Sequence, residues 1–271
     1  MAKSKVRIYK ISSSLKQNER ISQALKELGL NGMSSSFDRT AQECIKNKKT
    51  PHDFLEGLLE KEFTLREDSR LQRWIQKAGF PFKRTLKEFD FTFQPTVDET
   101  QISDLASCQY IDKTEDVVFM GPPGVGKTHL SVALGYEAIY SGHDVKFLTL
   151  DQLVELVERK ASAEERHYLF TSLLRPDLLI LDEMDLYETS TNAATFLFKL
   201  LHQRYETGSV IFASNRSFEE WGRLFGSQQR AAAILDRLHH HATIIKIEGE
   251  SYRLKDKLRD NPNLVASLNS N

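Results

Sequence analysis

The stretch GPPGVGKTH, Gly121 to His129, decides the fold class of this 271-residue chain. A short apolar segment, 116–120, precedes it, and a segment rich in alanine and leucine, 128–140, follows it. A glycine-rich turn between a strand and a helix that closes on Gly-Lys-Thr is the pattern of a phosphate-binding P-loop. Its glycines let backbone N–H groups approach a phosphate, and the helix N-terminus adds a partial positive charge at the same place.

The residues of this loop have predicted roles in nucleotide binding. Lys127 would place a full positive charge on the β- and γ-phosphates, and the hydroxyl of Thr128 would hold Mg²⁺. A chance glycine loop is disfavoured, because a strand and a helix are both expected beside it. The predicted nucleotide-binding residues of the motif are Gly121, Pro122, Pro123, Gly124, Val125, Gly126, Lys127, Thr128 and His129.

Composition and charge are those of an ordinary globular protein, with 40% hydrophobic residues, 28% charged residues and a net charge of -1. Residues 1–20 hold six cations and one acid, which is compatible with contact to DNA phosphates or with a solvated tail. Cys44 and Cys108 lack metal-ligand spacing and indicate reduced thiols. Because the sequence shows no membrane-spanning run and no signal segment, we expect a cytoplasmic protein with no membrane partner.

Residues 1–78 are predicted to form a small helical domain. Apolar residues recur at helical spacing, and Asn31-Gly32 is expected to stop the first helix. Along the third helix, cations recur every three or four residues, which fits either a helix that follows a DNA backbone or a solvated face. The domain has no catalytic constellation, so we expect it to bind DNA or a partner. The expected helices are 16–30, 34–47 and 50–78, and the cations are Arg66, Arg70, Arg73 and Lys77.

Residues 79–115 are predicted to be a linker that includes one wall of an adenine pocket. The segment FDFTFQP, 89–95, has aromatic residues at alternate positions. In an ATPase, such a segment before the P-loop strand often lines the adenine pocket. The alternative is a connection whose phenylalanines cap the domain core.

Strands and helices alternate over 116–258, which predicts an α/β domain with a parallel five-stranded sheet flanked by helices. Residues 259–271 are expected to form a polar tail. The expected strands are 117–120, 145–150, 178–181, 209–213 and 243–247. The expected helices after the P-loop helix are 151–160, 164–174, 191–206, 218–225 and 228–239.

Two acids, Asp182 and Glu183, follow the apolar run 178–181. Because burial of an unpaired carboxylate is costly, acids at the end of a buried strand indicate function. In a P-loop ATPase we expect this strand to lie beside the P-loop strand. Asp182 would then bind Mg²⁺, and Glu183 would polarise the attacking water. Asp185 is a further candidate for an indirect Mg²⁺ contact, with surface solvation as the alternative.

Polar residues later in the chain complete the predicted site. Asn215, at the tip of the next strand, would orient the lytic water, or it is a turn residue. Arg237 would reach the γ-phosphate in a neighbouring subunit, with Arg230 as a second candidate for this role and helix-dipole compensation as the alternative. Arg253 would contact nucleotide in its own subunit. The consecutive histidines 239–241 project in different directions and are not expected to share a metal.

These motifs together resemble the IstB family, which are AAA+ helper ATPases of insertion-sequence transposons and relatives of the DnaC and DnaI helicase loaders. The resemblance covers most of 66–258, whereas Met184-Asp185 departs from the glycine-containing turn common in the family. It rests on GPPGVGKTHL at 121–130, LLILDE at 178–183, SN at 214–215, FEEWGRLFG at 218–226, LDRLHHHA at 235–242 and IEGESYRLK at 247–255.

The resemblance implies an ATPase that uses ATP and Mg²⁺ and has an AAA+ core without a separate lid domain. It would form a homo-oligomer on duplex DNA, largely independent of DNA sequence, with ATP sites shared between subunits. It would select or remodel target DNA and recruit and stimulate an IstA-type transposase. The alternative is a replicative helicase loader of the DnaC/DnaI kind. A small-molecule kinase is disfavoured, because no second substrate motif or arginine-rich lid is present.

Overall fold

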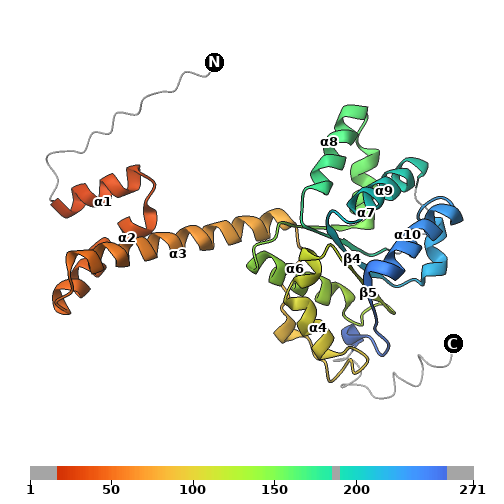
Figure 1. The fold of residues 1–271 in the computed structure, drawn as a ribbon, viewed down its shortest axis with the longest axis horizontal. Coiled ribbons are helices and arrows are strands. Elements are labelled where there is room, and N and C mark those ends of the chain that lie inside the picture. Colours follow the sequence, from red (N-terminus) through yellow and green to blue (C-terminus); the bar gives the residue numbers. More distant parts are fainter. Residues whose placement is uncertain (1–16, 185–189, 255–271) are drawn as a thin grey trace. The chain divides into compact units, whose positions relative to one another are not determined.

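The computed structural model describes residues 17–184 and 190–254 (Figure 1). Contacts within the chain divide it into two compact units, Met1–Arg73 and Trp74–Asn271. The basic segment before residue 17, Asp185 and the tail 259–271 lie outside the described residues. Within the described ranges, no helix has the length and apolar character needed to cross a membrane.

The first unit is built from helices α1 (Gln17–Glu27) and α2 (Asn31–Lys46) and from most of α3 (Pro51–Ala78). The expectation that Asn31-Gly32 stops the first helix is wrong, because α2 begins there. The carboxylate of Glu62 in α3 accepts the N–H groups of Gly32 and Met33, at 2.7 and 3.2 Å, and so caps the start of α2. A Cβ on Gly32 would stand 2.5 Å from the carbonyl oxygen of Lys61. Only glycine therefore allows α2 to approach α3 this closely.

The second unit contains a parallel five-stranded sheet in the order β2-β3-β4-β1-β5. Each expected strand is present with boundaries within one residue of the prediction. The expectation that the strand before Asp182 lies beside the P-loop strand is wrong, because β4 lies between them and pairs with both. The strands are β1 (Asp116–Met120), β2 (Val145–Thr149), β3 (Leu178–Asp182), β4 (Ser209–Ser214) and β5 (Ala242–Lys246).

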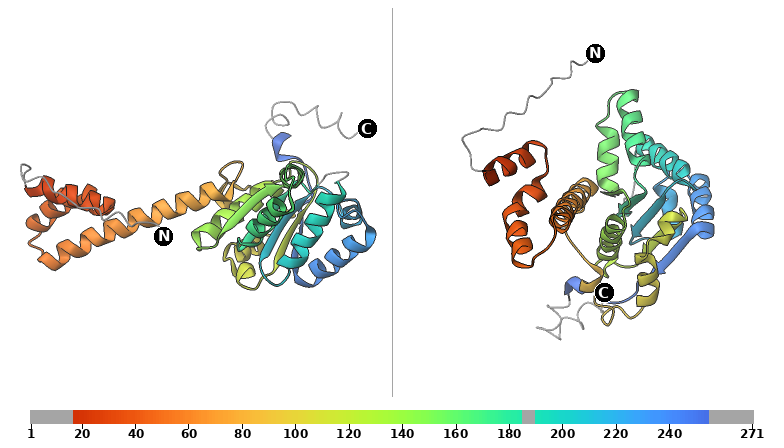
Figure 2. Two further views of the ribbon diagram at one scale, coloured as in Figure 1. Left: turned by 90° about the horizontal axis from the view of Figure 1, so that it is seen from above. Right: turned by 60° about the vertical axis from the view of Figure 1, so that its left-hand side comes forward.

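Helices cover both faces of this sheet, as the two further views in Figure 2 show. Helix α6 contacts four of the strands on one face, and α4 packs against α6. On the other face, alternate strand residues pack with α7, α8, α9 and α10. The helices are η1 (Leu86–Glu88), α4 (Glu99–Ala106), α5 (Gln109–Asp112), α6 (Lys127–Tyr140), α7 (Leu150–Glu158), α8 (Ala163–Leu174), α9 (Thr191–Arg204), η2 (Phe218–Arg223), α10 (Gln228–His241) and η3 (Tyr252–Leu254).

Two of these helices, α4 and α5, lie in the segment 79–115, where the sequence patterns predicted none. The carboxylate of Asp98 accepts the N–H of Thr100 at 2.8 Å and caps the start of α4. Ile102, Leu105 and Tyr110 of these helices are buried in the second unit. The expected helix 218–225 is a 3-10 helix, η2, over Phe218–Arg223.

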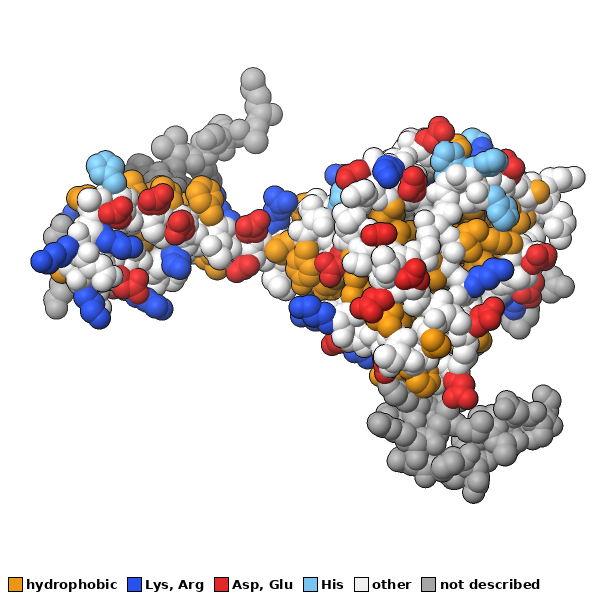
Figure 3. Space-filling model, turned by 60° about the horizontal axis from the view of Figure 1, so that its bottom comes forward, with side chains coloured by type: hydrophobic (Ala, Val, Ile, Leu, Met, Phe, Trp, Pro, Cys, Tyr) orange, Lys and Arg blue, Asp and Glu red, His pale blue; other side chains and the backbone are white. Residues whose placement is uncertain are grey.

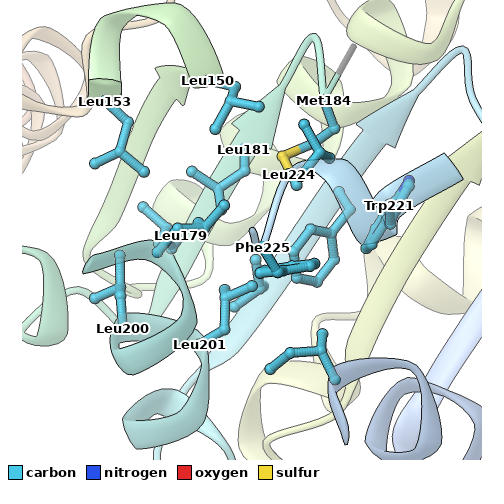
Figure 4. Packing of buried hydrophobic residues seen from close by; sticks show 14 of the residues in the cluster. Leu150, Leu153, Leu179, Leu181, Met184, Leu200, Leu201, Trp221, Leu224 and Phe225 are labelled. Atoms are coloured by element: carbon cyan, nitrogen blue, oxygen red, sulfur yellow. The ribbon is translucent and has the colours of Figure 1, made fainter. Parts of the chain in front are cut away.

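The core on the α7–α10 face fixes the ends of the strands that carry the acids. Figure 4 shows Leu179 and Leu181 of β3 packed among side chains that include Met184, Trp221 and Phe225. All five side chains are fully buried. Burial of each large apolar side chain stabilises the fold by about 1.5–3 kcal/mol. The chain therefore has little freedom immediately before and after Asp182 and Glu183.

Candidate active site

The P-loop borders a cavity of about 780 Å³ at the carboxyl edge of the sheet. Because parallel strands end at the same edge, the segments after β1, β3 and β4 all reach it. Of the residues that the sequence predicted, the cavity is lined by Pro123, Gly124, Val125, Gly126, Lys127, Thr128, His129, Asp182, Glu183, Asn215 and Arg253. Segments that are far apart in sequence are thus brought together at one place.

The P-loop curls around the side chain of Lys127. The ammonium group donates to the carbonyl oxygens of Gly121 and Pro122, both at 2.7 Å, so these two residues contribute to the site through their backbone. Lys127 is also the first residue of α6, and Gly126 before it has a φ of 106°, which favours glycine. The N-terminus of α6 and the lysine charge therefore point at the same space.

Two of the P-loop glycines, Gly124 and Gly126, lie against side chains of two other segments. A Cβ on Gly124 would overlap the side chain of Ser251, and a Cβ on Gly126 would stand 2.6 Å from the ring of Phe89. Ser251 and Phe89 can approach these two positions closely only because they lack a Cβ. The backbone N–H groups of such a glycine-rich loop can bind phosphate oxygens. This cradle and the cavity volume fit a nucleoside triphosphate.

The two acids at the end of β3 have different surroundings. Asp182 is buried, whereas Glu183 is exposed to the cavity and has a φ of 53°. The next residue, Met184, is fully buried, and its N–H donates to the carbonyl oxygen of Ala213 in β4 at 3.0 Å. This anchor takes the place of the glycine-containing turn and holds Glu183, which lines the cavity, in a left-handed conformation.

Ser214, the last residue of β4, shapes the turn that carries Asn215. Its hydroxyl accepts the N–H of Arg216 at 3.0 Å and the indole N–H of Trp221 at 3.4 Å. Ser214 and Trp221 are fully buried, so the turn is fixed from the core side. Asn215 itself is exposed and lines the cavity together with the P-loop.

The structure does not bring Arg237 or Arg230 into this cavity. Arg237 stacks over the ring of Tyr205 at 4.8 Å, and it borders a separate space of about 20 Å³ beside Asp116, the first residue of β1. It therefore lies near the amino edge of the sheet, away from the P-loop. Arg230 donates to the hydroxyl of Thr195 at 3.1 Å. Within one subunit, neither arginine completes the site.

Several cavity residues had little or no signal in the sequence. Alternate aromatic residues pointed to Phe89, but nothing singled out Gln94 or Tyr252, which line the cavity too. The ring of His129 donates to the carbonyl oxygen of Thr85 at 2.8 Å and so ties the segment before Phe89 to α6. Burial lowers the pKa of His129, so its ring is neutral near pH 7.

Metal binding at this site would depend on ligands from outside the chain. Over the described ranges, no group of three or more histidine, cysteine, aspartate or glutamate side chains is placed to hold a metal ion. The histidines 239–241 form the last turn of α10, and among the described residues they are not part of such a group. Thr128 and Asp182 both line the cavity, and their oxygen atoms are of the kind that Mg²⁺ prefers, with its other ligands taken from phosphate oxygens and water.

Comparisons with known proteins agree with this arrangement. Residues 23–260 match the family model described as IstB-like ATP binding protein. An insertion sequence IS21 putative ATP-binding protein from Pseudomonas aeruginosa is 37% identical over 233 residues, which are 86% of this chain and 88% of that protein. An insertion sequence IS5376 putative ATP-binding protein from Geobacillus stearothermophilus is 37% identical over 239 residues, which are 88% of this chain and 95% of that protein.

Solved structures show the same fold at lower sequence identity. The crystal structure of DnaI has a TM-score of 0.51 and 18% identity, and the match covers 61% of this chain and 91% of that one. The replication initiator DnaA bound to AMPPCP and single-stranded DNA has a TM-score of 0.52 and 21% identity, over 67% of this chain and 56% of that one. At such identities, the likeness is one of fold alone.

Proposed function

Because this chain belongs to the family of IstB-like ATP-binding proteins, we propose that it is the ATP-dependent helper of an insertion-sequence transposon. The chain is an AAA+ P-loop ATPase. In the proposed function it assembles as a homo-oligomer on duplex DNA and selects or remodels the target. It then recruits and stimulates an IstA-type transposase.

One observation carries this proposal, namely the convergence of the P-loop, the two acids and Asn215 on one cavity. Lys127 and the N–H groups of the loop would neutralise and hold the β- and γ-phosphates. Glu183, exposed in the cavity, would accept a proton from the attacking water, and Asn215 would orient that water. Arg253 would contact the nucleotide from η3.

Mg²⁺, held by Thr128 and Asp182, would supply positive charge to the phosphate oxygens. Asp182 is buried at the end of β3 and lines the same cavity as Thr128. The domain division is part of the proposal: residues 1–78 would bind DNA or a neighbouring subunit, 79–115 would include one wall of the adenine pocket, and 116–258 would hydrolyse ATP.

The position of Arg237 supports a shared ATP site. Its guanidinium lies near the amino edge of the sheet, whereas Glu183 lies at the carboxyl edge. An arginine finger from this chain would therefore act on the nucleotide of the next subunit, which requires a head-to-tail assembly. Arg230, on the same helix α10, is the second candidate for this contact.

DNA contact is proposed to be through phosphates and largely independent of sequence. On the face drawn in Figure 3, acidic and basic side chains are interspersed rather than gathered by sign. Along α3, Arg66 pairs with Glu62 at 2.7 Å and Lys77 with Asp144 at 2.6 Å, while Arg73 donates to the backbone carbonyl of Ser69 in its own helix. Binding by scattered cations predicts a steep loss of affinity with salt.

The helicase-loader alternative gains no specific support, because the likeness to DnaI is one of fold at 18% identity. A single experiment separates the two functions. The mass of the protein on duplex DNA is measured by light scattering, with ATP and Mg²⁺ and then with ADP. Large ATP-dependent assemblies on bare DNA would support the transposition helper. A small species that ignores duplex DNA but binds a hexameric helicase would overturn it.

A further inference from the structure

Gln94 is a buried amide that lines the nucleotide cavity, and only 1% of its surface is exposed. Its side-chain nitrogen donates to the carbonyl oxygen of Glu250 at 2.9 Å. Because an amide nitrogen donates and a carbonyl accepts, this bond fixes which end of the side chain is the oxygen. The oxygen, Oε1, is buried and has no hydrogen-bond partner among the described residues. Buried acceptors are rarely left unpaired, so this atom calls for a donor.

One residue lies against this oxygen, and aromatic residues line the cavity to which Gln94 belongs. Gly249 has a φ of 138°, and a Cβ there would stand 3.0 Å from Oε1, so any other residue would crowd the oxygen. Phe89 and Tyr252 line the same cavity and supply apolar ring faces. Tyr252 also donates its backbone N–H to the carbonyl oxygen of Gly124 at 2.9 Å, which places these groups next to the P-loop.

We propose that Gln94 selects adenine over guanine at this site by accepting a hydrogen bond from the 6-amino group of the base. The inference rests on the proposed function, since it names the group that reads the base of the bound nucleotide. Adenine carries a donor at position 6, whereas guanine and hypoxanthine carry a carbonyl oxygen there. With either of the latter, two acceptors would face each other and Oε1 would stay unpaired, which disfavours binding.

The test compares dissociation constants of ADP, GDP and IDP for the full chain, measured by isothermal titration calorimetry. Diphosphates are used because they are not hydrolysed during the titration. ADP is expected to bind roughly ten- to a hundred-fold more tightly than both GDP and IDP. IDP separates the effect of position 6 from that of the 2-amino group of guanine.

Two variants then assign the preference to Gln94. Gln94→Met keeps the size of the side chain but removes the acceptor, so the ADP preference should collapse to within a few-fold. Thr96→Val is the matched control, because Thr96 bonds Glu248 in the same pair of segments without lining the cavity. It should keep the preference. An unchanged ratio in Gln94→Met would mean that Gln94 only ties the segments together, and would overturn the proposal.

The ratio of the wild-type dissociation constants for GDP and IDP to that for ADP tests base selection even if a variant fails to fold. Tight but equal binding of ADP, GDP and IDP would overturn base selection and leave the ATPase role standing. Failure to bind any of the three would overturn the proposed function, and base selection with it.

Discussion

Mixing two inactive variants, Glu183→Gln and Arg237→Ala, should restore ATP hydrolysis if the site is shared between subunits. Glu183 lines the cavity at the carboxyl edge of the sheet, and Arg237 packs on Tyr205 near the opposite edge. A complete site would then take Glu183 from one subunit and Arg237 from the next. Alone, the first variant should lose about 10²- to 10⁴-fold in rate, and the second about 10³- to 10⁵-fold.

The size of the recovery follows from this geometry. In an equal mixture, half of the nucleotide-holding subunits carry an intact Glu183, and half of their neighbours carry an intact Arg237. Random assembly therefore completes about a quarter of the sites, and the rate should reach about a quarter of the wild-type rate. The recovery should be greatest at equal amounts and should fall symmetrically on either side.

Phosphate release is measured as the ratio of the two variants is varied at constant total protein on duplex DNA. Arg230→Ala is the matched control, because Arg230 is on the same helix and also stacks on an aromatic ring, that of Phe198. If a mixture of Glu183→Gln with Arg230→Ala, rather than with Arg237→Ala, recovers ATP hydrolysis, then Arg230 is the arginine finger. No recovery at any ratio, with the mass of the assembly unchanged, would refute a finger acting between subunits.

Three further changes test single residues. Lys127→Ala should weaken ATP binding by at least ten-fold, roughly the loss of one charge-assisted bond, and should abolish assembly on DNA; unchanged light scattering would contradict this. Met184→Ala should cost about 2–5 kcal/mol in urea unfolding and slow turnover, because the buried side chain next to Glu183 is lost while its backbone N–H remains. Burial raises the pKa of Asp116 from 3.8 to about 7. The folded state therefore keeps a proton that the unfolded state loses, and wild-type stability falls as pH rises from about 4 to 7. Asp116→Asn should remove this fall and raise the free energy of unfolding at pH 8 by at most about 4 kcal/mol. Equal urea midpoints of the variant and the wild type at pH 8 would contradict this prediction.

The sequence predicted the parts of the fold that depend on local pattern. The P-loop could be located because a strand, a glycine turn and a helix follow one another within a few residues. The order of the strands could not be predicted from the same information. The sequences of β1, β3 and β4 are all short and apolar. Such a pattern does not indicate which strand will be its neighbour in the sheet.

The features of the fold and the site that the sequence did not predict depend on contacts between residues far apart in the chain. Helices α4 and α5 are short, and such helices gain their stability from packing rather than from a strong sequence pattern. Gln94 and Glu250 are joined by a hydrogen bond across most of the second unit's sequence. Likewise, the left-handed backbone at Glu183 follows from the burial of Met184, which only the packed core reveals.

At positions 248 and 250, the segment after β5 should evolve under a constraint on its length rather than on its composition. At these two positions and at Tyr252, it meets the neighbouring segments through backbone atoms: the N–H and carbonyl of Glu248, the carbonyl of Glu250 and the N–H of Tyr252. Almost any side chain can present such atoms, so substitutions at 248 and 250 should be tolerated in descendants of this gene. An inserted or deleted residue would shift every one of these atoms and open a wall of the nucleotide cavity, and selection should remove it.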